Sequence, residues 1–282
     1  MELHLRKAFT LIELLVVVTI LVVLLALLTP ALDKAVEQAE RAVCGANQRS
    51  IAAGAVMYAM ENRKQFFICR GREVETTFVI VGNGHGYSGR EGDDQVDWLA
   101  AMATVGLASS SPTTLEDGRP HNAPTKVWSC PSSGYRGYWD PFWGAQYWTS
   151  YQYYGGIETW RSELGGTMQA GIPSRSPVNL SRSEGDWVVT ADRSILFSRT
   201  DWNDGGIPHY WSGNPNHKSA EHNGPAGNNQ GYVDGSVGWV DGRELINIHS
   251  YRDNGRQAGF FYQRDLGGWV PPATARAETY LP

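Results

Sequence analysis

Side chains that could bind a metal ion gather in the last third of the chain. Asp201, Asn203 and Asp204 place three oxygen atoms close together, and oxygen atoms are the ligands that calcium prefers. The further candidate ligands in this part of the sequence are His209, His217, His222 and Asp234. The acidic run lacks the spacing of a calcium loop, and no two histidines stand four residues apart on a helix as in many zinc sites. A calcium site at the acidic run therefore competes with a polar loop held by Asp and Asn side-chain turns.

Catalytic motifs are missing from the sequence. The glycine-rich stretch at residues 82–89 is not followed by a helical pattern and therefore predicts a loop instead of a nucleotide site. No phosphate-binding loop, zinc-protease motif or nucleophile elbow is present. Asp, Glu and His occur, but no spacing singles out a pair for acid–base chemistry. We expect a protein that is not an enzyme.

Aromatic side chains crowd into residues 135–160, where 11 of 26 residues are Phe, Trp or Tyr. Aromatic faces stack on sugar rings, and Tyr and Trp are enriched at protein interfaces. Trp139, Trp143 and Trp148 are the candidates for such a ligand surface. The competing interpretation is a small core beneath long loops, which we favour, and a surface that serves both roles would satisfy both.

The composition limits the environment and the partners of the protein. The net charge of the 282-residue chain is −5, so a nucleic-acid partner is not expected. The three cysteines, Cys44, Cys69 and Cys130, form no Cys-x-x-Cys pair, which disfavours zinc ribbons and thioredoxin chemistry. Outside the cytoplasm they would form one disulfide and leave one thiol, and their spacing leaves the pairing open.

A long apolar segment precedes all of these groups. Residues 14–28 contain only Leu, Val, Ile, Ala and one Thr, yet Glu13 stands directly before them. A cleaved secretory signal is one interpretation, with Arg6 and Lys7 as its basic part and a mature chain starting near Leu32. A plain membrane anchor is the second, because residues 9–31 have about the 20 residues that a bilayer requires. The basic pair would then stay cytoplasmic and the remainder would lie outside.

The third interpretation accounts for Glu13. The stretch KAFTLIELL at residues 7–15 resembles the signature of type IV pilins and type II secretion pseudopilins. The resemblance implies cleavage by a prepilin peptidase between Ala8 and Phe9, with Ala in place of the usual Gly, and N-methylation of Phe9. It also implies that Glu13 pairs with the new amino terminus of a neighbouring subunit. A carboxylate in hydrocarbon costs about 3 kcal/mol unless it is paired, so this pairing would set the register of assembly.

The helical pattern continues beyond Pro30, where we expect a bend and not an end. Apolar positions at three- and four-residue steps predict one apolar side on this second half: Leu32, Val36, Ala39, Val43, Ala46, Ser50, Ile51, Val56 and Met60. A helix over residues 9–62 would be roughly 80 Å long. Such a helix requires lipid or copies of itself around its bare apolar half.

The remaining sequence resembles a pilin-like family of planctomycete- and verrucomicrobia-type bacteria. The motif residues are Cys44, Asn47, Arg49, Tyr58 and the pair Cys130-Pro131. The two cysteines of these motifs, Cys44 and Cys130, are our candidate disulfide. The family ends in His, nine residues and Asp-Gly, whereas here eleven residues separate His222 from Asp234-Gly235. The residues themselves predict a hairpin that turns at Asp234-Gly235, with further strands at 75–82, 186–192 and 193–199.

These observations together predict an α+β pilin-like fold, with a long helix packed on an antiparallel sheet with long loops. The expected parts are a leader at 1–8, the helix at 9–62 and an extracytoplasmic head at 63–282. The resemblance implies a subunit of a pilus-like or secretion-pseudopilus filament in the cytoplasmic membrane. Its partners would be copies of itself, the prepilin peptidase, the inner-membrane assembly platform and lipid. Some pseudopilins also bind calcium in C-terminal loops. The alternative is a membrane-anchored glycan- or partner-binding module that does not polymerise.

Overall fold

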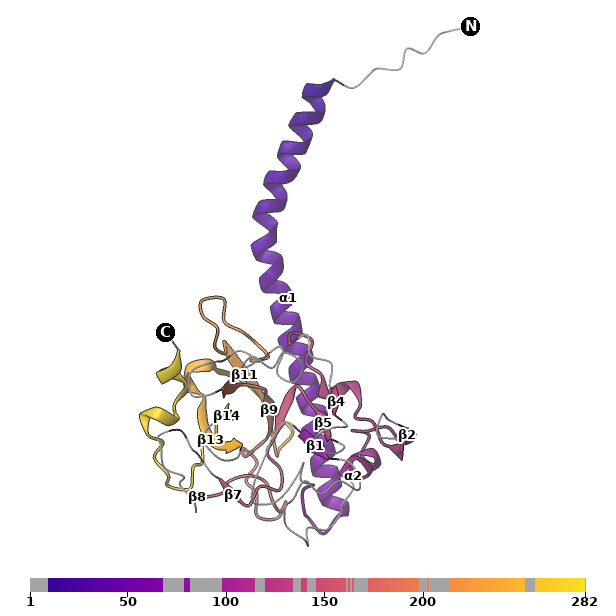
Figure 1. The fold of residues 1–282 in the computed structure, drawn as a ribbon, viewed down its shortest axis with the longest axis vertical. Helices are drawn as coiled ribbons and strands as arrows, with labels where there is room; N and C mark the ends of the chain where they lie inside the picture. Colours follow the sequence, from indigo (N-terminus) through magenta and orange to yellow (C-terminus); the bar gives the residue numbers. More distant parts are fainter. Residues whose placement is uncertain are drawn as a thin grey trace. The chain divides into compact units, whose positions relative to one another are not determined.

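The computed structural model describes residues 10–67, 79–81, 98–114, 120–133, 138–140, 146–160, 162, 164, 172–197, 202, 214–251 and 257–281. The chain forms two compact units, Met1–Glu40 and Arg41–Pro282. Helix α1 (Leu11–Glu61) contributes residues to both units (Figure 1). Each unit is described by itself below.

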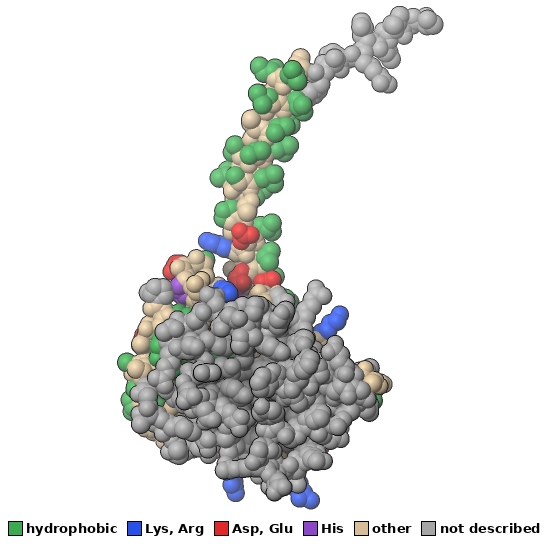
Figure 2. Space-filling view, in the orientation of Figure 1, with side chains coloured by type: hydrophobic (Ala, Val, Ile, Leu, Met, Phe, Trp, Pro, Cys, Tyr) green, Lys and Arg blue, Asp and Glu red, His purple; other side chains and the backbone are tan. Residues whose placement is uncertain are grey.

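The described part of the first unit consists of α1 residues and Thr10. Its large apolar side chains, from Leu11 to Leu32, are between 47% and 88% exposed. They cover the visible face of this half of the helix (Figure 2). The helix continues through Pro30 without ending. An apolar helical surface that is exposed along its most apolar stretch requires a lipid or protein environment.

The described residues of the second unit form three antiparallel sheets and two short two-stranded ribbons. The central sheet has the strand order β12-β11-β9-β6, the second has β10-β14-β13, and the third has β1-β5-β4. The ribbons are β2-β3 and β7-β8.

The strands are β1 (Val79–Val81), β2 (Thr113–Thr114), β3 (Pro120–His121), β4 (Tyr138–Asp140), β5 (Gln146–Trp148), β6 (Tyr151–Tyr153), β7 (Thr159–Trp160), β8 (Ile172–Pro173), β9 (Val188–Asp192), β10 (Ile195–Phe197), β11 (Gly227–Tyr232), β12 (Val237–Asp241), β13 (Ile246–Tyr251) and β14 (Gln257–Phe261). The short helices are α2 (Trp98–Thr104), η1 (Lys126–Trp128), η2 (Gly242–Glu244), η3 (Ala273–Ala275) and η4 (Ala277–Tyr280).

The central strand β9 is buried along its whole length. Val189 belongs to the apolar cluster that includes α1, whereas Val188 belongs to the cluster formed with β13 and β14. Successive strand residues point to opposite faces, so β9 separates two cores. Because both faces are buried, the polar residues of β9 need partners inside the protein, and the Thr190 hydroxyl donates to the Gln152 carbonyl at 2.9 Å.

The α+β arrangement predicted from the sequence is confirmed, but the predicted apolar side of α1 in the second unit is correct only in part, at Ile51 and Val56. Val43 and Met60 are 50% and 60% exposed. The buried stripe is instead formed by Cys44, Gln48, Ile51, Ala52, Gly54, Ala55 and Ala59. Most of these side chains are small, and small side chains let the helix axis approach a sheet closely. Hydrophobicity alone therefore included exposed positions such as Val43 and Met60 and left out the small buried ones.

The predicted hairpin is confirmed. Gly231 pairs with Val237, and the turn between β11 and β12 has Gly235 at φ +82°. A side chain would be strained at this φ value, whereas glycine adopts it readily. The Asp234 side chain accepts a hydrogen bond from the Ser236 N–H at 2.8 Å and completes the turn. Strands β1, β9 and β10 fall within the three further predicted ranges.

Candidate functional site

The start of α1 is closed by a reciprocal pair of hydrogen bonds. The Thr10 N–H and hydroxyl donate to Glu13 Oε2 at 2.9 and 2.7 Å, and the Glu13 N–H donates to Thr10 Oγ1 at 3.3 Å. Thr and Glu three residues apart at a helix start form a capping box, which satisfies backbone donors that the helix itself cannot. Glu13 thus has a role within its own chain at the N-terminal end of the apolar surface.

Pro30 removes one backbone hydrogen bond from the apolar half of α1. Next to it, the Thr29 hydroxyl donates to the Leu25 carbonyl at 2.8 Å, four residues back. Hydroxyl groups bonded in this way carry no unsatisfied donor into hydrocarbon. Among the described helices, α1 is the one that is long and apolar enough to cross a membrane.

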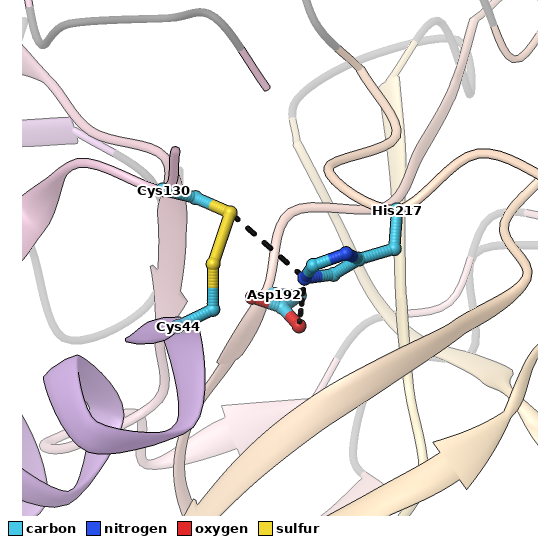
Figure 3. A group of neighbouring side chains, drawn as sticks. All are labelled: Cys44, Cys130, Asp192 and His217. Carbon is cyan, nitrogen blue, oxygen red and sulfur yellow. Dashed lines mark hydrogen bonds and ion pairs between the residues drawn. A yellow bond between two sulfur atoms is a disulfide. The ribbon is translucent and has the colours of Figure 1, made fainter. Parts of the chain in front are cut away.

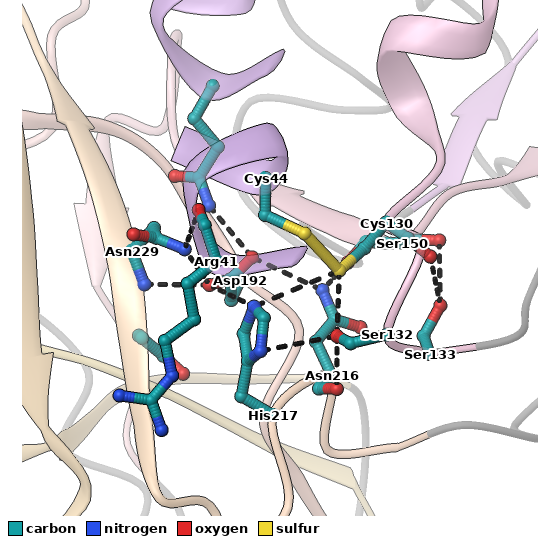
Figure 4. A network of polar contacts seen from close by, with 12 residues as sticks. Arg41, Cys44, Cys130, Ser132, Ser133, Ser150, Asp192, Asn216, His217 and Asn229 are labelled. Atoms are coloured by element: carbon teal, nitrogen blue, oxygen red, sulfur yellow. Dashed lines mark hydrogen bonds and ion pairs between the residues drawn. A yellow bond between two sulfur atoms is a disulfide. The ribbon is translucent and has the colours of Figure 1, made fainter. Parts of the chain in front are cut away.

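A polar network lies inside the second unit, around the carboxylate of Asp192 at the end of β9 (Figure 4). Oδ2 accepts hydrogen bonds from the Asn229 N–H at 2.7 Å and from Asn229 Nδ2 at 3.0 Å. Oδ1 accepts from Gln48 Nε2 of α1 at 2.9 Å and from Asn216 Nδ2 at 3.3 Å. Asp192 is fully buried, so these donors replace the water that it has lost.

Opposing effects act on the pKa of the Asp192 carboxyl group. Burial raises the pKa of Asp192 above its usual value, while His217 and the amide donors of Asn229 and Asn216 oppose that shift. His217 Nε2 lies 3.4 Å from Asp192 Oδ2, and neither side chain is exposed. Burial, followed by the charge of Asp192, also raises the pKa of the Tyr151 hydroxyl well above its usual value.

A disulfide joins Cys44 of α1 to Cys130 beside this pair (Figure 3). Cys130 Sγ lies 3.9 Å from His217 Nε2. One ligand atom from each of Cys44, Cys130, Asp192 and His217 lies within 4.8 Å of the other three. The four residues come from α1, the loop after η1, the end of β9 and the segment before β11.

Arg41 and Trp239 lie at the edge of the same network. The guanidinium carbon of Arg41 is 3.9 Å from the centre of the Trp239 ring, and that ring stands edge-on to His217 at 5.4 Å. Asn229 Nδ2 also donates to the Arg41 carbonyl at 3.2 Å. Cation, indole and imidazole thus contact one another in series, and the imidazole contacts the buried carboxylate.

The other described candidate residues of the sequence analysis lie in turns and on α1. His222 Nδ1 accepts the Gly224 N–H at 3.1 Å in one turn, and Asp234 caps the hairpin turn described above. Asn47 and Tyr58 lie on α1, where Asn47 Nδ2 donates to the Ser129 carbonyl at 3.2 Å. The motif asparagine therefore connects α1 to the loop that carries Cys130.

Several predicted sites fall on residues that the structure does not describe. The cleavage point between Ala8 and Phe9, the acidic run Asp201, Asn203 and Asp204, and Trp143 lie outside the described residues. Trp139 and Trp148 lie in β4 and β5, and their side chains are not described. The described aromatic side chains of residues 149–160 are buried: Tyr151, Tyr153, Tyr154 and Trp160.

Sequence reasoning missed the central role of Asp192. It named His217 only as one of several possible loop ligands and Asp192 only as the end of a strand. The available signal was weak: an acidic residue closes a mostly apolar strand, where an unpaired charge would be costly. Gln48, another buried member of the network, lies within the Cys44 motif, but the sequence analysis gave it no role.

Comparisons with known proteins concern the N-terminal segment. Residues 3–29 match the family model described as the prokaryotic N-terminal methylation motif. No curated protein and no solved structure matches the chain. The match confirms the resemblance to prepilins, and it indicates a substrate of the type IV pilin and pseudopilin peptidase with a helix suited to membrane anchoring. The resemblance of the C-terminal part to the family with His and Asp-Gly stays a prediction.

Proposed function

We propose that this protein is a structural subunit of a type IV pilus-like or type II secretion pseudopilus-like filament. The prepilin peptidase cleaves the precursor before Phe9, and the cytoplasmic membrane holds the mature chain by the first half of α1. The second unit lies outside that membrane. Assembly by the inner-membrane platform then transfers the helix from lipid to contacts with copies of itself.

The observation that carries this proposal is the exposed apolar surface of α1, most of which lies within the methylation motif at residues 3–29. Sixteen large apolar side chains between Leu11 and Leu32 are exposed. Full burial of an exposed side chain of this kind gains about 1.5–3 kcal/mol, and these side chains have 47–88% of their surface still to bury. A bilayer and a helical filament core both supply that burial. The same apolar surface therefore contacts lipid before assembly and neighbouring helices after it.

Glu13 makes the free energy of the helix differ between the bilayer and the filament core. Its carboxylate contacts Thr10 within the chain, but those neutral donors leave a negative charge at the apolar surface. In hydrocarbon an uncompensated charge costs about 3 kcal/mol. The amino terminus of Phe9 on a neighbouring subunit compensates the charge in the filament and favours the register in which the two groups meet.

The mature N-terminus tests the processing step. Mass spectrometry of the protein from its native envelope should find a chain that starts at N-methylated Phe9. A start near Leu32 or an intact Met1 would instead identify a secreted or a permanently anchored protein, and either would overturn the proposal.

A charge-removal variant tests assembly separately. Glu13→Leu should be processed and inserted normally but should fail to form the subunit-to-subunit crosslinks of the wild-type filament. The matched control is Asp33→Leu, which removes an exposed carboxylate from the same helix outside the methylation motif. Crosslinking of Glu13→Leu at the wild-type level would overturn the role of Glu13 in assembly, whereas a wild type that forms no such crosslinks would favour the non-polymerising binding module.

A further inference from the structure

We propose that the reduced form of the second unit binds one zinc ion through Cys44, Cys130, His217 and Asp192. The disulfide and the zinc site are then two alternative states of the same four residues. The ligand set is two thiolates, one imidazole and one carboxylate, all of which zinc accepts. This inference concerns the second unit and does not depend on filament assembly.

The distances between the ligand atoms suit a tetrahedral ion. Zinc bonds of about 2.0–2.3 Å place neighbouring ligand atoms about 3.3–3.8 Å apart. His217 Nε2 is 3.4 Å from Asp192 Oδ2 and 3.9 Å from Cys130 Sγ. The Cα atoms of Cys44 and Cys130 are 5.5 Å apart, so both sulfur atoms reach one ion after side-chain rotation alone.

The orientation of the imidazole is set from its other side. The Ser132 hydroxyl donates to the Asn216 carbonyl at 2.7 Å, so its oxygen accepts the hydrogen of His217 Nδ1 at 3.2 Å. In the neutral imidazole this contact leaves the lone pair on Nε2, which faces a carboxylate oxygen and a sulfur atom. Three such acceptors converge favourably only around a cation, which is a proton or a metal ion.

The residues behind the ligands resemble those of a structural metal site. Asn229 and Gln48 donate hydrogen bonds to the Asp192 carboxylate, and these bonds orient the group and stabilise its negative charge. All four ligand residues are at most 2% exposed. A closed site with four protein ligands holds structural zinc and leaves no open position for a substrate.

The two states interconvert with balanced chemistry. Zinc binding to the reduced pair displaces the two thiol protons of Cys44 and Cys130. A disulfide oxidant then takes two electrons from the thiolates, is itself reduced to two thiolates, and leaves the protein disulfide and a released zinc ion. Before oxidation, zinc would hold together the four segments that the disulfide and the Asp192 network hold afterwards.

The test compares the two redox states of the full-length chain in detergent. The protein is reduced with a phosphine, supplied with zinc, desalted and analysed for metal content. The reduced wild type should retain about one zinc per chain and the oxidised wild type none. Zinc should also slow alkylation of Cys44 and Cys130 severalfold but leave the rate at Cys69 unchanged.

Variants separate this site from adventitious binding. Cys44→Ser and His217→Gln should lose the ion, whereas Cys69→Ser and His222→Gln should retain it. A reduced wild type without zinc, retention by Cys44→Ser, or equal protection of Cys69 would each overturn the inference. The alkylation comparison uses only the wild-type chain, so it decides the question even where a variant does not fold.

Discussion

Asp192 is the residue on which most of the buried polar structure depends. Its carboxylate accepts four hydrogen bonds from Gln48, Asn216 and Asn229, and it faces His217. These partners lie on α1, on the segment before β11, and on β11 itself. Removal of the acceptor would leave several buried donors without a partner, which costs more than the loss of one exposed hydrogen bond.

We therefore expect Asp192→Asn to lower the free energy of unfolding of the oxidised protein by about 3 kcal/mol. The introduced amide group would face the amide donors of Gln48 or Asn229 and could accept at one oxygen only. Denaturant unfolding in detergent, followed by Trp fluorescence, measures the loss. Asp234→Asn is the control and should change stability by less than about 0.5 kcal/mol, because its side chain lies in an exposed turn. Equal effects of both variants would contradict this account.

At the scale of elements, the close approach of α1 to β11 decides how the helix packs. A Cβ atom on Gly231 would meet the Gln48 carbonyl oxygen at 3.0 Å and the Ala52 Cβ at 3.4 Å. It would also meet Thr190 Cγ2 of β9 at 2.9 Å. Glycine on the strand and alanine on the helix thus allow Gln48 to reach Asp192, which longer side chains between the elements would prevent.

Gly231→Ala should accordingly destabilise the second unit by about 1–3 kcal/mol, because the added methyl group forces helix and sheet apart. The matched control on the same hairpin is Gly238→Ala, whose Cβ would only make an ordinary contact with Tyr232 at 3.5 Å. The readouts are the denaturation midpoint and hydrogen exchange of α1 amides near Gln48. A neutral Gly231→Ala variant would show that the helix is not held at this distance.

At the scale of the whole molecule, the Cys44–Cys130 disulfide closes a loop between residues 86 positions apart. It connects the buried end of α1 to the loop that leads into β4, β5 and β6. A covalent closure of that length restricts the unfolded chain strongly, and the chain-entropy estimate for it is about 4–5 kcal/mol. Without the disulfide, packing and the Asp192 network would hold this part of α1 against the rest of the second unit.

The double variant Cys44→Ser/Cys130→Ser should therefore unfold at a clearly lower temperature than wild type, with a loss of up to about 4 kcal/mol. Thermal unfolding in a metal chelator measures this loss without any contribution from bound zinc. Cys69→Ser, which leaves the disulfide in place, should unfold like wild type. A double variant as stable as Cys69→Ser would assign the cohesion of the second unit to packing alone.

The sequence by itself determined the features that depend on neighbouring residues. The segment from Phe9 to Glu13 predicted the prepilin character, the apolar run predicted the exposed helix, and Asp234-Gly235 predicted a hairpin turn. Each depends on backbone preferences or on a local pattern over a few residues. Such signals remain readable because no distant partner is needed to produce them.

Only the tertiary structure decided which face of α1 is buried and which polar residues meet. Gln48 and Asp192 are 144 positions apart, and Cys130 and His217 are 87 apart. Their meeting depends on how closely Ala52 and Gly231 let the helix approach the sheet, and residue spacing does not encode that distance. Hydrophobic periodicity predicted a helix but placed Val43 and Met60 on its buried side, whereas close packing buried Ala52, Gly54 and Ala55.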